Sequence, residues 1–427
     1  MKLIQVVLIL SAPFLLSVYA DNTPNLCTDD IPNLTKVKPS QTALHDIPPI
    51  TVGSATYDGD ADHFVVRPVL GQGETYKRAL IYIPGTTDRP ELSSCLIKSA
   101  AKSLDIPVLA LSYQYLNSGD KFRNAKCEVQ GPAEQIKCLE EQHKDAIDGG
   151  NYGATHFKDG KPLWGAVLAK NSLTSRLGDL LYYLHRQHPT EGWGSFLEEN
   201  SKLPKWEKLV MSGHSQGAGH VAYLAKTHQL YGAVMISGPQ DECTNCAAGT
   251  TFWIDEKNKA PVGSTFYSAL GHWSEPLFDV MKNNWARMKA ADVTINWGSA
   301  EPVDVGLALE TEYADACTTP LVTNVTYAST STCGGKEHCS TAIDDSVPFT
   351  ETSNDGKIYL YGEKVWPALM EGADGKNSCK KTLQNSELFY PDWKGTEYIC
   401  KDDGGQEPYS KFANCLFCFR YPSDSLP

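Results

Sequence analysis

Beyond its first 20 residues the chain lacks any apolar run long enough to cross a membrane. A membrane helix needs about 18 consecutive apolar residues, and none follows the stretch 3–18. That first stretch follows Lys2 and ends in the triplet Val18-Tyr19-Ala20, which is typical of a signal peptide cleaved before Asp21. We therefore expect a secreted protein without a membrane anchor, with residues 1–20 as its signal peptide.

The chain also lacks an excess of positive charge and an internal repeat. Its net charge is −13, whereas nucleic acids and anionic membranes are bound through a basic surface. Neither is expected as the main partner. The acidity otherwise indicates no more than good solubility outside the cell.

Cysteine, by contrast, is abundant. Thirteen cysteines in an exported chain favour disulfides, although the odd number leaves at least one unpaired. Cys243-x-x-Cys246 has zinc as a weaker alternative to a disulfide, because no second ligand pair with suitable spacing lies nearby. Two N-glycosylation patterns begin at Asn33 and Asn324. The candidate local bridges are Cys127/Cys138, Cys243/Cys246 and pairs within the group Cys317, Cys333 and Cys339.

Apolar runs alternate with helical patterns through the middle of the chain. Strand, helix and strand in this order predict a doubly wound, mostly parallel α/β sheet. Residues 21–60 show little periodicity and are predicted to be a leader segment along the surface. The predicted strands are 79–83, 107–112, 208–212, 233–237 and 265–270, and helices are expected over 173–184 and 218–227.

The segment 117–164 is polar and rich in glycine, which predicts a long loop that either serves function or carries no fixed structure. It is a candidate lid. Its aromatic residues Tyr152, Phe157 and Trp164 are candidates for the wall of a substrate pocket, with a stabilised surface insertion as the equal alternative.

The motif Gly213-His214-Ser215-Gln216-Gly217 lies between an apolar strand and a helix of small residues. In this context the glycines let the backbone turn sharply, so that the hydroxyl of Ser215 projects as a nucleophile. The amide of Gln216 then faces a developing oxyanion. A second amide, that of Thr86, is expected from the loop Ile83-Pro84-Gly85-Thr86-Thr87 after an earlier strand.

A base and an acid should follow the serine in the order carboxylate, histidine. His338 lies in a glycine-rich loop after the last strand region and is the predicted base. For the acid we favour Glu275, after a later strand, and Asp241 stays open as the alternative. His220 and His228, on the helix after Ser215, are expected to serve packing or the helix surface.

Together these residues resemble the α/β-hydrolase superfamily over about residues 78–348, in particular a branch of poorly characterised secreted hydrolases of bacterial type. The resemblance implies an α/β-hydrolase catalytic domain, here 61–372, and ester hydrolysis through an acyl-enzyme without a cofactor. Peptidases and lipases share the same triad. The acidic position that aligns with Glu275 commonly carries aspartate, and a cysteine beside His338 also departs from the pattern; a disulfide there could fix the loop.

The last segment, 373–427, is predicted to be a small disulfide-rich module, because so short a unit has little core of its own. It is similar to cysteine-rich modules of diatom secreted and surface proteins, which implies contact with a surface or a carbohydrate. A second hypothesis follows from it: an inert hydrolase-fold binding protein that this module targets to a surface. The primary hypothesis is a secreted esterase.

Overall fold

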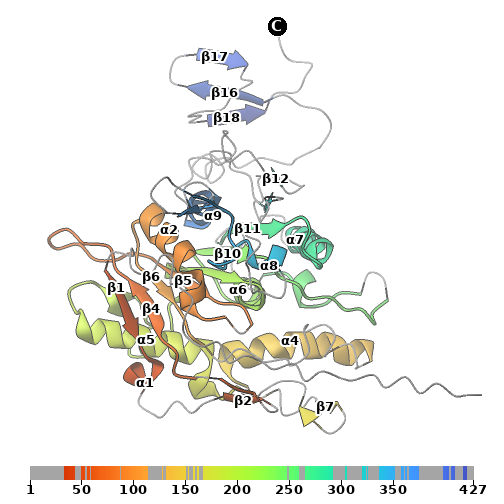
Figure 1. Cartoon of the computed structure of the whole chain (residues 1–427), viewed down its shortest axis with the longest axis horizontal. Coiled ribbons are helices and arrows are strands. Elements are labelled where there is room, and N and C mark those ends of the chain that lie inside the picture. Colours follow the sequence, from red (N-terminus) through yellow and green to blue (C-terminus); the bar gives the residue numbers. More distant parts are fainter. Residues whose placement is uncertain are drawn as a thin grey trace, which may run out of the picture.

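A computed structural model provides the fold (Figure 1). The predicted signal peptide, 1–20, lies outside the described residues, and so does most of the 292–335 segment. The structure describes residues 33–43, 50–52, 55–57, 59–86, 88–113, 127, 131–150, 152, 157–158, 161–162, 167–247, 250–258, 265–291, 303–304, 320–323, 325, 336–351, 357–359, 361–362, 365–374, 398–402, 405–408 and 417–420.

A nine-stranded mixed sheet forms the centre of the molecule (Figure 1). Seven strands run parallel to their neighbours, and the two at one end pair antiparallel. The central strands are continuous apolar runs, as expected of strands covered on both faces. In spatial order the strands are β1 (Leu34–Val37), β4 (His63–Val66), β6 (Val108–Ala110), β5 (Ala79–Ile83), β9 (Leu209–His214), β10 (Gly232–Ile236), β11 (Phe266–His272), β13 (Leu321–Thr323) and β12 (Val303–Asp304).

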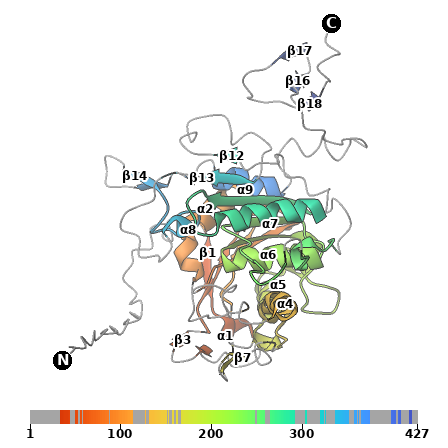
Figure 2. The same cartoon turned by 90° about the vertical axis from the view of Figure 1, so that its right-hand side faces the viewer.

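Helices cover both faces of this sheet, which confirms the predicted doubly wound arrangement. In β5, Ile81 and Ile83 contribute to one hydrophobic core, and Leu80 and Tyr82 contribute to the other, because successive side chains of a strand point to opposite faces. Figure 2 shows α7, α6 and α5 in a row on one side. That face carries α5 (Leu173–Gln187), α6 (Gln216–Thr227) and α7 (Phe278–Ala291), and the opposite face carries α2 (Ser94–Leu104) and α9 (Val365–Asp374).

The order of strands fixes where a site can form. From β5 the chain passes to β6 on one side and later returns to β9 on the other. In open α/β sheets, ligands bind beyond the carboxyl ends of the strands at such a reversal. The residues that follow β5 and β9, near Gly85 and Ser215, therefore lie at the expected place.

The leader segment 21–60 contains the edge strand β1, which pairs with β4 in the main sheet. The sequence did not predict this strand, because four residues show little alternation. The prediction of a loop over 117–164 is wrong. The predicted loop 117–164 contains the 17-residue helix α4 (Pro132–Asp148). Much of the buried face of α4 is polar, with Gln135, Gln142 and His143, so the apolar spacing that signals a helix is weak.

No helix in the described ranges is long and apolar enough to cross a membrane.

The remaining elements are short. Within the predicted C-terminal module, β16, β17 and β18 form an antiparallel sheet in which Cys400 is opposite Cys418. The short elements are α1 (Pro39–Thr42), β2 (Ile50–Val52), β3 (Ala55–Tyr57), β7 (Phe157–Lys158), β8 (Lys161–Pro162), α8 (Lys336–Cys339), β14 (Phe349–Glu351), β15 (Lys357–Tyr359), β16 (Tyr398–Asp402), β17 (Gly405–Pro408), β18 (Phe417–Arg420), and the 3-10 turns Pro90–Ser93, Ala169–Asn171, Trp193–Phe196, Trp206–Lys208 and Trp253–Asp255.

Candidate active site

Ser215 occupies a strained turn between β9 and α6. Its φ of 54° and ψ of −119° lie outside the regions that non-glycine residues favour. Such strain persists only where the surroundings impose it, and it concentrates at functional sites. The amide of Ser215 donates to the carbonyl of Ile236, 2.8 Å away, so the turn is tied to the neighbouring strand β10.

The two motif glycines permit this turn by their lack of a side chain. A Cβ on Gly213 would lie 2.4 Å from the backbone of Gly217, and a Cβ on Gly217 would lie 2.1 Å from the carbonyl oxygen of Ile83. Both distances are far below van der Waals contact. The Gly-x-Ser-x-Gly spacing is therefore a steric requirement of this elbow.

Glu275 and His338 are joined by a hydrogen bond. Glu275 Oε2 lies 2.7 Å from Nδ1 of His338, and the Glu275 side chain is inaccessible to solvent. Its other oxygen, Oε1, accepts from the hydroxyl of Ser237 and from the amide of His272, each at 2.7 Å. The carboxylate is thus fixed on both oxygens and aligned with one ring nitrogen of His338.

The backbone of His338 is held as firmly as its ring. Its carbonyl accepts from Nε2 of His214 at 3.0 Å and from the hydroxyls of Thr341 and Ser237 at 3.0 and 3.3 Å. The next residue, Cys339, is disulfide-bonded, as expected for a bridge that fixes this loop. Within the described residues His338 therefore has a restricted position beside the elbow.

Asp344 anchors the far end of the same loop. Its carboxyl group accepts from the amide of Cys95 at 3.0 Å and contacts the hydroxyl of Ser94 at 2.5 Å, at the start of α2. Burial raises the pKa of Asp344 to about 8, although the hydrogen bonds with Ser94 and Cys95 oppose that increase. The loop that carries His338 is thereby attached to a helix of the sheet's other face.

Thr86 and Gln216, the predicted oxyanion donors, come from the ends of β5 and β9 and touch each other. The hydroxyl of Thr86 donates to Oε1 of Gln216 at 2.5 Å. Gln216 is the first residue of α6, so its amide has no acceptor within the helix. Two loops that could each supply an amide beside Ser215 are therefore linked directly.

Asp241 lies elsewhere, in a separate buried network. Its Oδ2 accepts from Nε1 of Trp253 and lies 2.8 Å from Nε2 of His143. Nδ1 of His143 is in turn 3.0 Å from Nδ1 of His220. The acid in contact with His338 is Glu275, whereas His220 belongs to the buried network of Asp241.

Neither a family model nor a curated protein sequence matches the chain. Solved esterase structures show remote similarity. The carboxylesterase EstE1 from a metagenomic library is 11% identical, with a TM-score of 0.30 over 61% of this chain and 76% of that one. The esterase of the archaeon Pyrobaculum calidifontis is 10% identical, with a TM-score of 0.30 over 61% of this chain and 71% of that one. Thermogutta terrifontis esterase 2, phosphorylated by paraoxon, is 11% identical, with a TM-score of 0.30 over 61% of this chain and 79% of that one. These values are too low to support a fold or an activity for this chain, and none bears on the predicted diatom-like module, which stays a prediction.

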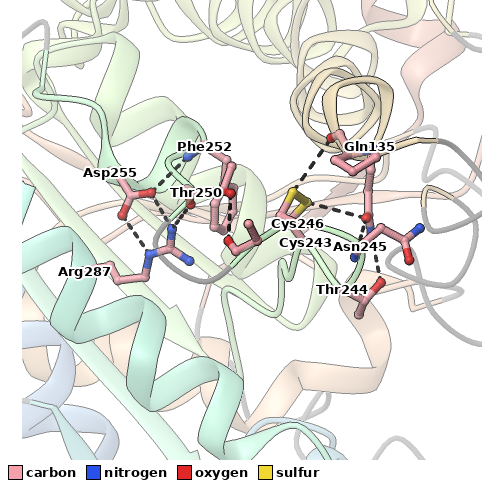
Figure 3. The surroundings of a disulfide bond; sticks show 11 residues. Gln135, Cys243, Thr244, Asn245, Cys246, Thr250, Phe252, Asp255 and Arg287 are labelled. Atoms are coloured by element: carbon pink, nitrogen blue, oxygen red, sulfur yellow. Dashed lines mark hydrogen bonds and ion pairs between the residues drawn. A yellow bond between two sulfur atoms is a disulfide. The ribbon is translucent and has the colours of Figure 1, made fainter.

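Cys243 and Cys246 form a disulfide, which rules out the zinc alternative for this pair. Figure 3 shows how the bridge lies against α4: the side chain of Gln135 accepts from the amide of Asn245 at 3.0 Å and donates to the hydroxyl of Thr244 at 3.1 Å. The described residues contain no cluster of three metal-ligating side chains. The predicted bridge Cys127–Cys138 is present as well.

Several residues that shape the site escaped the sequence prediction. His214 and Ser237 both lie in recognised motifs, yet their contacts with the His338 carbonyl span 124 and 101 residues of sequence. Ser237 also has a φ of 51°, a strained backbone conformation that the composition of the sequence does not predict. Of the proposed pocket wall, Tyr152 is half-buried next to α4, the side chain of Phe157 is not described, and Trp164 lies outside the described residues.

Proposed function

We propose that the protein is a serine hydrolase of the α/β-hydrolase type that cleaves carboxylic esters through an acyl-enzyme on Ser215. The observation that carries the proposal is the 2.7 Å contact between the buried Glu275 and Nδ1 of His338 beside the strained elbow. A buried carboxylate costs free energy unless it is fully hydrogen-bonded, and this one orients the imidazole of His338, whose ring lies against that of His214, the residue before Ser215.

In the proposed acylation step, the Ser215 hydroxyl oxygen attacks the ester carbonyl carbon while Nε2 of His338 accepts the hydroxyl proton. Glu275 accepts from Nδ1–H, which fixes the tautomer that leaves Nε2 able to take that proton. When the tetrahedral intermediate collapses, the C–O bond to the alcohol breaks and His338 returns the proton to the leaving oxygen. Water repeats the cycle on the acyl-enzyme, so no cofactor is needed.

The negative charge on the carbonyl oxygen needs donors during this step. We assign that role to the backbone amides of Gln216 and Thr86, since both follow strands whose carboxyl ends meet at the elbow. The hydrogen bond between the two side chains supports the assignment, because it keeps the two loops at a fixed separation. Donors that are already in place cost no reorganisation when charge develops.

We also propose that the protein acts outside the cell. Two disulfides are present, and Cys95 and Cys339 are disulfide-bonded as well. Such bridges persist in oxidising compartments. Expression of the full chain should therefore release a shortened protein that begins near Asp21 into the medium; retention of the uncleaved chain in the cell would contradict export.

Hydrolysis of p-nitrophenyl acetate and butyrate tests the proposed reaction. Ser215→Ala should reduce activity to background, because it removes the proposed nucleophile. Ser268→Ala is the matched control: Ser268 is buried in β11, and its hydroxyl has no hydrogen-bond partner among the described residues. Full activity in Ser215→Ala would overturn the proposal, and a wild type that binds but never cleaves esters would favour the inert binding protein.

The substrate's size is a separate question, and a series of ester chain lengths addresses it. We propose that part of the segment 117–164 contributes the pocket wall. Its helix α4 packs against α6, which begins at the elbow. Deletion of the segment outside α4 should then change the preferred chain length, whereas an unchanged preference would remove this assignment.

A further inference from the structure

His214, the residue before Ser215, is almost completely buried yet has no part in the proton transfers described above. Its side chain is 2% exposed. Nε2 lies 3.0 Å from the carbonyl oxygen of His338, and Nδ1 lies 3.3 Å from Oδ2 of Asp88. One imidazole thus contacts both loops that approach the nucleophile.

Both partners of His214 are oxygen acceptors. The carbonyl of His338 can only accept, so Nε2 of His214 must carry a hydrogen and donate it. The tautomer of His214 is therefore fixed by its contact with the backbone of His338.

The same imidazole supports the His338 ring. The two ring centroids are 4.8 Å apart, with planes inclined by 34°. Glu275 holds Nδ1 of His338, and Nε2 of Gln240 lies 3.3 Å from the same nitrogen, but contacts at one ring atom still allow the ring to pivot about that point. The neighbouring ring of His214 and its hydrogen bond to the His338 carbonyl oppose this pivot.

On its other side His214 meets the loop that follows β5. Asp88 belongs to this loop, and its amide donates to the carbonyl of Gly85 at 3.2 Å. A Cβ placed on Gly85 would lie 2.8 Å from Oδ2 of Asp88, 3.1 Å from Cβ of Ser215 and 3.2 Å from Nδ1 of His214. Three side chains therefore converge on the backbone next to Thr86, the proposed oxyanion donor.

We propose that His214 is a positioning residue: through its two ring nitrogens it holds His338 and Asp88, in the loop after β5, in fixed relation to Ser215. The proposal rests on the proposed serine-hydrolase function and extends it. The competing role is plain core packing, in which any side chain of similar size would serve.

Two isosteric substitutions separate these roles, because each keeps one of the two contacts. The amide nitrogen of glutamine can take the place of Nε2, so His214→Gln retains a donor to the His338 carbonyl. Asparagine reaches only the place of Nδ1, so His214→Asn loses that donor. We expect His214→Asn to lower kcat for p-nitrophenyl acetate by about 100-fold, the effect of a misplacement of roughly 1 Å, with KM within about threefold and a smaller loss in His214→Gln.

A third variant provides a test that does not depend on the folding of the His214 variants. Thr341→Val removes another donor to the same His338 carbonyl and should also lower kcat more than it changes KM. Equal kcat in His214→Asn, His214→Gln and wild type, or losses that only follow the thermal unfolding midpoints, would overturn the positioning role while Ser215→Ala still established the hydrolase. A wild type without esterase activity would overturn both.

Discussion

Glu275 and His338 are 63 residues apart in the sequence and meet at 2.7 Å in the fold. Glu275 follows β11 and His338 lies in α8. The hydroxyl of Ser237, after β10, donates to the carboxylate and lies 3.3 Å from the His338 carbonyl oxygen. Three loops at one edge of the sheet are thus joined around a single carboxylate.

Glu275→Gln should reduce kcat by about 10³ to 10⁴-fold with little change in folding, because an amide no longer secures the tautomer that leaves Nε2 of His338 basic. Steady-state kinetics with p-nitrophenyl esters measure the loss. Retention of more than a tenth of the wild-type kcat would contradict the assigned role of Glu275.

Asp241→Asn is the matched carboxylate variant. It should lower the stability of the fold and leave kcat nearly unchanged. His143 and Trp253 both contact Oδ2 of Asp241, and the amide oxygen of asparagine can take that place. The substitution still exchanges a buried carboxylate for an amide, so we expect a loss of no more than about 1–3 kcal/mol in the free energy of unfolding. Urea unfolding should show the loss, while kcat should change by less than about tenfold. A loss of kcat as large as that of Glu275→Gln would restore Asp241 as the acid.

Two glycine substitutions should separate stability from activity. In Gly217→Ala the new methyl meets the backbone oxygen of Ile83, which cannot move without disturbing β5, so we expect a loss of about 1–3 kcal/mol or more in the free energy of unfolding. In Gly85→Ala the nearest atom is the Asp88 side chain, which can move. Gly85→Ala should therefore fold normally and have a lower kcat. A normal kcat would show that the reaction does not need the free space between Asp88, His214 and Ser215.

Asp344 should make the protein less stable as the pH rises. Burial raises its folded pKa to about 8 from an ordinary 3.8, so between these values the folded state keeps a proton that the unfolded state has lost. The free energy of unfolding then falls by up to about 1.4 kcal/mol per pH unit in that window. Urea unfolding between pH 4 and 8 should show a flatter profile in Asp344→Asn than in wild type, and identical profiles would contradict the buried, protonated carboxyl.

His63 should make the protein less stable as the pH falls below 6.5. Burial, together with the positive charge of Arg176, lowers its pKa to about 3 from 6.5, and its Nδ1 accepts from the amide of Ser112. Below pH 6.5 the unfolded chain gains a proton that the folded chain does not, so stability falls as the pH falls. His63→Asn keeps an acceptor for Ser112 and should reduce this acid sensitivity; an unchanged pH dependence would exclude His63 as its source.

The central strands and the elbow could be predicted because they depend on local sequence. Buried parallel strands such as β5 and β10 are continuous apolar runs, and the turn at Ser215 needs glycine at fixed spacing. Helix α4 was missed because polar side chains fill much of its buried face, and β1 because a four-residue edge strand carries too little periodicity.

The contacts within the site were harder to predict for a physical reason. The choice between Glu275 and Asp241 depends on which carboxylate the fold brings to His338, and both follow strands of the same sheet. The contact of Glu275 with His338 and the separate network of Asp241 with His143 distinguish them, and His143 lies in the helix that sequence patterns missed. The contacts of His214 depend in the same way on a loop 124 residues distant.

Covalent labelling with a fluorophosphonate tests the central claim most directly. The probe reacts with a serine only where a base activates the hydroxyl, and peptide mapping by mass spectrometry identifies the modified residue. We predict a single adduct on Ser215 in wild type and in Ser268→Ala, no adduct in Ser215→Ala, and much slower labelling in Glu275→Gln. Absence of an adduct from folded wild-type protein, or an adduct that persists in Ser215→Ala, would contradict the assignment of Ser215 as the nucleophile.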